Sequence, residues 1–136
     1  IKNGVAQKIP YPDESFDVVF VNGALHHMPI RKETYKESIK EMDRVLKPGG
    51  HVFFMEPGRY WAKIFCELGA IILGGVSKTF KDWASAIYVE RAEIHYFIKN
   101  HPIFRNDFKE RNYNVLSDTY FIFSWLYSAQ KARRLD

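Results

Sequence analysis

The 136-residue sequence contains very little cysteine. Its single cysteine is Cys66, which excludes an intramolecular disulfide and a zinc site built from several cysteines. A lone cysteine fits a reducing compartment, and the sequence therefore predicts a cytoplasmic location.

Long hydrophobic runs and clusters of basic residues are also absent. The longest apolar stretch, residues 68–76, has about half of the ~20 residues that a membrane-spanning helix needs. No secretory signal opens the chain. Twenty Lys and Arg face sixteen Asp and Glu, a net charge of +4, without the clustered excess typical of nucleic-acid binders. The sequence predicts no integral membrane segment and no nucleic-acid partner.

What is present is a sequence typical of one folded unit. Apolar residues make up 46% and charged residues 26%, as in soluble domains. The nearly continuous apolar run at residues 16–22 predicts a strand buried on both faces. Residues 32–46 carry an apolar stripe at helical spacing, ended by Lys47-Pro48-Gly49-Gly50, and residues 51–56 predict a second strand. A helix between two strands predicts a right-handed crossover with parallel strands.

The second half of the chain predicts further helices and a closing pair of strands. Residues 60–76 and 82–99 have helical character, and Pro102 is expected to end the second helix. Residues 113–117 and 121–129 are rich in β-branched and aromatic side chains, which favours an antiparallel pair. The predicted fold class is α/β: two parallel strands with a crossover helix, then helices and a C-terminal antiparallel pair.

Three motifs in residues 5–57 together resemble a known family. The segment Ile9–Val19 contains Pro12-Asp13-Glu14-Ser15-Phe16-Asp17, the next motif is Asn22-Gly23-Ala24-Leu25-His26-His27, and the third runs from Glu41 through Arg44-Val45-Leu46-Lys47-Pro48-Gly49-Gly50. In this order and spacing they resemble the C-terminal half of class I S-adenosylmethionine-dependent methyltransferases, of the type 11 and ubiquinone/menaquinone-biosynthesis kind. The resemblance implies a partial Rossmann-like sheet, one partial domain over residues 1–136, and a helical region at 58–100 that covers the substrate.

The resemblance also implies a cofactor site for S-adenosylmethionine. In open α/β sheets, ligands lie beyond the carboxyl ends of the strands, and residues 22–24 follow the first predicted strand. The residues expected at the cofactor are Val5, Ala6, Asn22, Gly23 and Ala24. Val5 stands where the family usually has an acidic or polar residue near the adenine.

Residues beyond the two strand ends are candidates for contact with the methyl acceptor. His26 and His27 are candidate catalytic bases, because a neutral imidazole can take a proton near pH 7; the alternative is a structural turn. The two rings are expected to point in different directions. Glu56, Tyr60 and Trp61 are candidate substrate-pocket residues, with ordinary packing as the alternative. Glu41 and Arg44 have the spacing of a surface ion pair. The spacing of His26 and His27 does not predict a metal site.

The family's glycine-rich turn and the acidic residue that holds the ribose are missing from residues 1–136, and residue 1 is Ile rather than Met. We expect a fragment of a methyltransferase that acts on a small-molecule or lipid-like acceptor, inactive on its own. The acceptor atom is open. An alternative is a non-catalytic half-domain that pairs with a partner or with itself, because a strand at 16–22 without a neighbour has an open, apolar edge.

Overall fold

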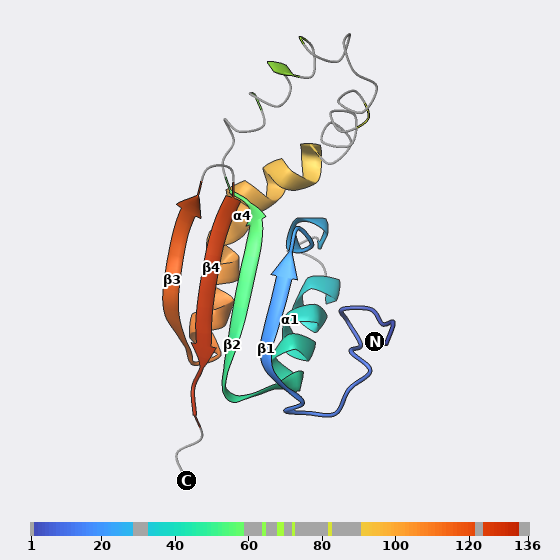
Figure 1. Cartoon of the computed structure of the whole chain (residues 1–136), viewed down its shortest axis with the longest axis vertical. Helices are drawn as coiled ribbons and strands as arrows, with labels where there is room; N and C mark the ends of the chain where they lie inside the picture. Colours follow the sequence, from blue (N-terminus) through green and yellow to red (C-terminus); the bar gives the residue numbers. More distant parts are fainter. Residues whose placement is uncertain are drawn as a thin grey trace.

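The computed structural model of the chain describes residues 2–28, 33–58, 64, 68–69, 72, 82, 91–121 and 124–133. Its strands are β1 (Phe16–Asn22), β2 (Leu46–Pro57), β3 (Tyr113–Phe121) and β4 (Ser124–Lys131). Its helices are the 3₁₀ turn η1 (Leu25–His27), α1 (Glu33–Val45) and α4 (Arg91–Glu110). The strands form one sheet in the order β1-β2-β4-β3, and α1 and α4 lie behind it (Figure 1).

The predicted α/β topology is confirmed. β1 and β2 pair in parallel and are joined through α1, whereas β4 pairs antiparallel with both β2 and β3. Both strands of the C-terminal pair are present with shifted bounds, 113–121 and 124–131 in place of 113–117 and 121–129.

The Lys47–Gly50 segment ends α1 as predicted, but it belongs to a longer β2. Phe16 is paired with Leu46 and Val18 with His51, so β2 advances by five residues while β1 advances by two. The extra residues bulge out of the ladder, and Gly49 takes a φ of +79° there, a value that glycine adopts without a Cβ clash.

The prediction that Pro102 ends a helix is wrong, because α4 continues to Glu110 with Pro102 inside it. Proline has no N–H for the carbonyl four residues back, here that of Ile98. The His101 ring nitrogen Nδ1 lies 2.8 Å from that oxygen and occupies the missing donor's position. Phe97, Phe104 and Phe108 are buried and anchor both halves of the helix.

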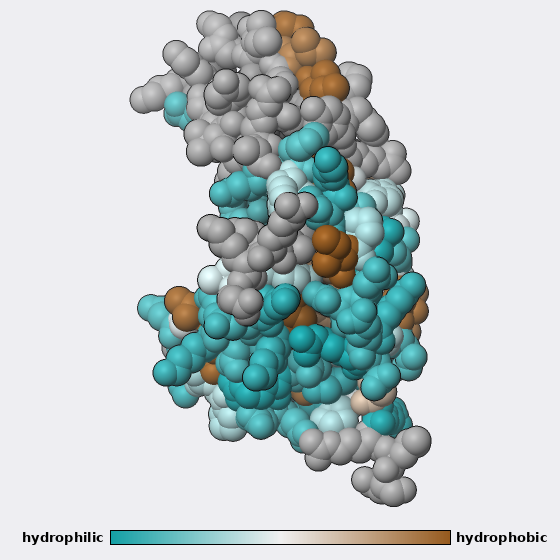
Figure 2. Space-filling model, turned by 180° about the vertical axis from the view of Figure 1, so that it is seen from behind, coloured by the Kyte–Doolittle hydropathy of each residue, from teal (hydrophilic) through white to brown (hydrophobic). Residues whose placement is uncertain are grey.

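The hydrophobic core lies between the sheet and the two helices. α1 contributes Tyr35, Ile39 and Met42, the stripe that the sequence predicts, and α4 contributes the phenylalanines. The sheet meets them with alternate side chains, because successive residues of a strand point to opposite faces. These are Val19, Val21, Val52, Phe54, Trp125, Tyr127 and Ala129. The outer face of the helices is largely polar (Figure 2).

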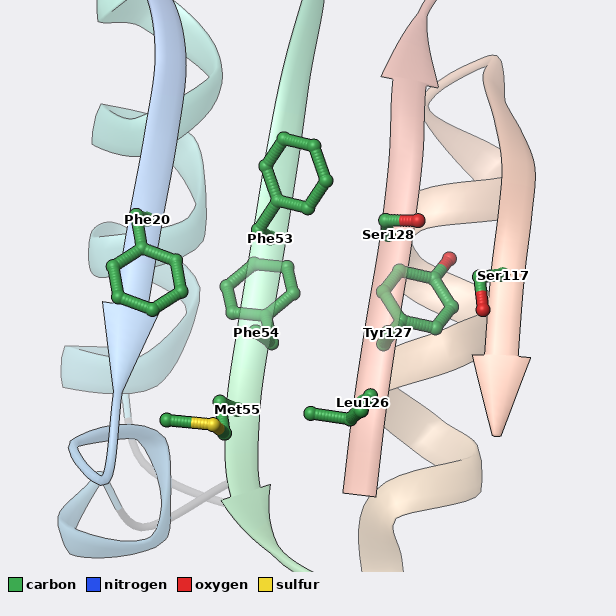
Figure 3. Close-up of a pocket in the computed structure, with 8 residues that line it drawn as sticks. All are labelled: Phe20, Phe53, Phe54, Met55, Ser117, Leu126, Tyr127 and Ser128. Atoms are coloured by element: carbon green, nitrogen blue, oxygen red, sulfur yellow. The ribbon is translucent and has the colours of Figure 1, made fainter. Parts of the chain in front are cut away.

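The opposite face of the sheet is open, so the prediction that β1 is buried on both faces is wrong. Val18 is 50% and Phe20 62% exposed. Phe20, together with Phe53, Met55 and Leu126, lines a shallow groove of about 200 Å³ across β1, β2 and β4 (Figure 3). In the described chain, β1 is also an edge strand with β2 on one side only.

Predictions for residues 58–100 can be followed only in part. Residues 91–100 form the first half of α4, and most of residues 59–90 lie outside the described residues. No helix in the described ranges has the length and hydropathy to cross a membrane.

Candidate functional site

The predicted cofactor turn lies where β1 ends, at the same edge of the sheet as the end of β2. The Gly23 N–H donates to the Met55 carbonyl at 2.8 Å and extends the β1–β2 ladder by one residue. Gly23 then turns the chain with a φ of +59°, and η1 follows directly. A Cβ added to Gly23 would meet no atom within 4 Å, so the described chain leaves open space beside the backbone at this turn.

Glu56, near the end of β2, binds this turn through its carboxylate. The residue is 1% exposed. The Ala24 and Leu25 N–H groups both donate to Oε1 at 2.9 Å. The His26 N–H approaches Oε2 at 3.4 Å, and His26 Nδ1 lies 2.8 Å from the same oxygen. The carboxylate proposed for the substrate pocket is thus engaged by the turn that follows β1.

The two candidate histidines have different surroundings. The His26 side chain is 4% exposed and paired with Glu56. The His27 side chain is 44% exposed, and its Nδ1 lies 2.7 Å from Glu93 Oε2 on α4. The expectation that the rings point in different directions is wrong, since their centroids are 4.0 Å apart. The two imidazoles lie side by side, and the exposed one is accessible to a ligand.

Glu93 is a contact that the sequence did not indicate. It lies 66 positions after His27 in the chain, and no motif joins the two residues. Their pairing depends on α4 bringing its first turn to η1, and a tertiary contact of this kind leaves no local signal in the sequence.

Val5 and Ala6 lie in a separate turn of the N-terminal segment. The Lys8 N–H donates to the Val5 carbonyl at 3.0 Å, and Val5 is 62% exposed. This segment runs beside α1 (Figure 1). The described hydrogen bonds do not join this segment to Asn22, Gly23 or Ala24.

Arg44 and Glu41 hold the N-terminal segment onto α1. The Arg44 guanidinium donates to both Glu41 carboxylate oxygens at 2.8 Å, and also to the carbonyls of Tyr11 and Ile9 and to Asp13. The Ile9 N–H donates to Glu41 Oε2 at 2.9 Å. The hydrogen bond from Arg44, followed by that from Ile9, lowers the pKa of Glu41 to about 2. The predicted ion pair of Glu41 and Arg44 is confirmed, and the same two side chains also bind the N-terminal segment.

Of the remaining predicted site residues, the structure describes Asn22 but not Tyr60 and Trp61. Asn22 pairs with Met55 at the end of the ladder, beside Gly23. Tyr60 and Trp61 lie outside the described residues. Within the described ranges, no group of three or more His, Cys, Asp or Glu side chains is arranged to hold a metal ion.

Comparison with known sequences shows which proteins this chain resembles. Residues 1–54 match the family described as "Methyltransferase domain". The ubiquinone/menaquinone biosynthesis C-methyltransferase of Chromobacterium violaceum is 46% identical over 57 residues, which is 41% of this chain and 21% of the relative. A demethylmenaquinone methyltransferase of Alkalihalophilus pseudofirmus is 37% identical over 68 residues, 50% of this chain and 27% of the relative. The chain thus spans less than a third of the length of these relatives.

Solved structures support the fold. A SAM-dependent methyltransferase of Methanosarcina mazei superposes with a TM-score of 0.54 at 16% identity, over 98% of this chain and 67% of that one. A protein of Pyrococcus horikoshii gives 0.55 at 14% identity, over 94% and 60%. Together these comparisons confirm the resemblance to class I S-adenosylmethionine-dependent methyltransferases of type 11.

The turn after β1 fits the cofactor that this class implies. Gly23 carries no side chain into the open space beside it, so a ligand can approach the main chain closely. Its position beyond the carboxyl ends of two parallel strands is where α/β sheets bind ligands.

Proposed function

We propose that this chain supplies part of the site of a methyltransferase that uses S-adenosylmethionine and acts on a small-molecule or lipid-like acceptor. The observation that carries the proposal is the open turn at Asn22–Ala24, at the carboxyl edge of a parallel strand pair, in a segment that matches the methyltransferase domain family. Two relatives are named for methylation of quinone precursors, which favours an aromatic acceptor ring. A cytoplasmic location is part of the proposal.

The chain's own contribution is to bind and orient. S-adenosylmethionine, when bound, supplies an electrophilic methyl group, and the backbone of Asn22, Gly23 and Ala24 would hold it, with Val5 and Ala6 on the adenine side. Of the two candidate bases, His27 is the more accessible to an acceptor, because its side chain is 44% exposed whereas that of His26 is 4% exposed. A ring that is hydrogen-bonded on one nitrogen can accept a proton on the other.

Titration of the ¹⁵N-labelled chain with S-adenosylhomocysteine tests the cofactor site. NMR shifts detect millimolar binding, which suits a site supplied only in part by this chain. We expect the amide signals of residues 22–24 to move more than those of β3, on the far side of the sheet. An absence of shifts at these residues up to several millimolar ligand would contradict the proposal.

A turnover assay with a radiolabelled methyl donor and a demethylated quinol tests the activity of this chain. We expect little or no methyl incorporation by the chain alone, because it lacks the glycine-rich turn that the family uses for the cofactor's amino-acid part. Robust incorporation would overturn this expectation.

The open sheet face favours a second candidate function, a half-domain that associates through β1 with a partner or with itself. Exposed apolar side chains beside an unpaired strand edge are typical of association surfaces. Sedimentation of the wild type and of Phe20→Lys tests self-association, with Phe121→Lys on β3 as the control, since Phe20 and Phe121 are 62% and 65% exposed. A monomeric wild-type chain across the micromolar range would refute self-association.

A further inference from the structure

Glu56 is the acidic residue among the buried polar side chains of the described chain; the others are His26, Ser38 and Ser128. It lies near the end of β2 and contacts the turn that follows β1. We infer that Glu56 is a positioning residue of the candidate site: it fixes the shape of the turn at residues 23–26 and the tautomer of His26. This inference rests on the proposed function, because the turn it shapes is the proposed cofactor site.

The burial of a carboxylate needs an explanation, because a buried charge is costly unless donors surround it. An apolar side chain would fill the same space without that cost. Among the described residues, the donors around Glu56 all belong to the short turn at residues 24–26: its Oε1 accepts from Ala24 and Leu25, and its Oε2 lies against His26. The carboxylate therefore stabilises the turn rather than the hydrophobic core.

The contact joins the ends of the two parallel strands. Glu56 lies at the end of β2, and its hydrogen-bond partners lie 30 to 32 positions earlier in the chain, directly after β1. Because Gly23 can adopt many backbone conformations, the turn needs an external partner to keep one of them. Glu56 supplies that partner through two backbone N–H groups at 2.9 Å.

The same carboxylate selects one tautomer of His26. A carboxylate oxygen accepts hydrogen bonds and cannot donate them, so the Nδ1 atom 2.8 Å from Glu56 Oε2 carries a proton. The His26 ring in turn lies against the His27 ring, with centroids 4.0 Å apart. Glu56 thus orients the exposed His27 ring through the buried His26 ring.

The substitution Glu56→Gln tests this inference without changing the side chain's size. If the Gln oxygen keeps the bonds from Ala24 and Leu25, its NH₂ group faces His26 Nδ1. Because that group donates, the neutral ring must shift its proton from Nδ1 to Nε2. Long-range ¹H–¹⁵N spectra of labelled histidine, recorded at alkaline pH, distinguish the two tautomers directly. A role in packing alone would leave the tautomer unchanged.

Glu93→Gln is the matched control, because Glu93 contacts the ring of His27 rather than that of His26. We expect the His26 tautomer to change in Glu56→Gln and to stay as in the wild type in Glu93→Gln. An unchanged His26 tautomer in Glu56→Gln would overturn the inference. A backbone ¹H–¹⁵N spectrum of the uniformly labelled variant with the signal dispersion of the wild type establishes that the variant is folded.

Titration with S-adenosylhomocysteine separates this inference from the proposed function. We expect Glu56→Gln to weaken binding by about tenfold, because the loss of roughly one hydrogen bond that holds the turn lowers the affinity by about that factor. Wild-type binding that Glu56→Gln leaves unchanged would refute the positioning role while supporting the proposed function. A wild-type chain without shifts at residues 22–24 would instead refute the proposed function, and the positioning role with it.

Discussion

Substitution of Gly23 by Ala separates a role in ligand binding from a role in folding. The φ of Gly23 is +59°, a left-handed value that costs a residue with a Cβ about 1–2 kcal/mol. The new methyl group meets no atom within 4 Å, so no packing cost adds to this strain. We expect the free energy of unfolding to fall by about 1–2 kcal/mol.

Gly49→Ala is the matched control because Gly49 also has a left-handed φ, so an added Cβ causes the same kind of backbone strain in a different place. Its φ is +79°, and an added Cβ would lie 3.3 Å from the Arg133 side chain, whose flexible end can give way. It lies in the bulge at the start of β2, whereas Gly23 lies after the carboxyl end of β1. We expect a similar loss of stability from both substitutions.

The two variants should differ in ligand binding. Urea unfolding gives the free energy of unfolding, and titration with S-adenosylhomocysteine gives the affinity of the same samples. We expect Gly23→Ala to lose most of the binding, because its methyl group occupies the space that the ligand needs, and Gly49→Ala to keep it. Equal affinities in the two variants would refute the placement of the cofactor at this turn. A stability loss well above about 3 kcal/mol in Gly23→Ala would refute the strain argument.

Three further predictions concern stability. Pro102→Ala should raise the free energy of unfolding by about 1–2 kcal/mol in urea, because the proline ring no longer crowds the Ile98 carbonyl and the new N–H can share that oxygen with His101 Nδ1; a decrease would show that packing requires the proline. Glu41 has a folded-state pKa of about 2 against an ordinary 4.5, so its contribution with Arg44 is present above pH 4.5 and is lost as the pH falls toward 2. Acid titration of Glu41→Gln should lack this loss, and an unchanged acid profile would refute it. Phe104→Ala should cost about 3–5 kcal/mol in the same urea assay, and a loss under about 1 kcal/mol would contradict a core position.

The elements that were predicted correctly are those with a local cause. The β-branched and aromatic run of β1 and the helical stripe Tyr35, Ile39 and Met42 are visible in short windows of sequence, and both are confirmed. The length of α4 was missed because its cause is a side chain that replaces a backbone donor: His101 next to Ile98. Such a contact cannot be distinguished in sequence from an ordinary helix end at Pro102.

The burial of β1 was predicted wrongly for a different reason. An apolar run shows that a strand has two apolar faces, but not which of them another element covers. In the described chain α1 and α4 cover one face only (Figure 1), and Val18 and Phe20 on the other face are exposed. The pattern of residues 16–22 therefore predicts two apolar faces for this strand, and the described elements cover one of them.

The N-terminal segment and the turn after β1 are stabilised by the same kind of contact. A carboxylate from a regular element accepts backbone N–H groups of the segment: Glu41 on α1 accepts from Ile9, and Glu56 on β2 accepts from Ala24 and Leu25. Each carboxylate also binds one cationic or aromatic side chain, Arg44 for Glu41 and His26 for Glu56. Since loops with unpaired backbone groups cannot be buried stably, these two acids let the chain bring loops against its sheet and helix without regular structure. The candidate site accordingly depends on side chains of the scaffold as much as on the loop residues that would touch a ligand.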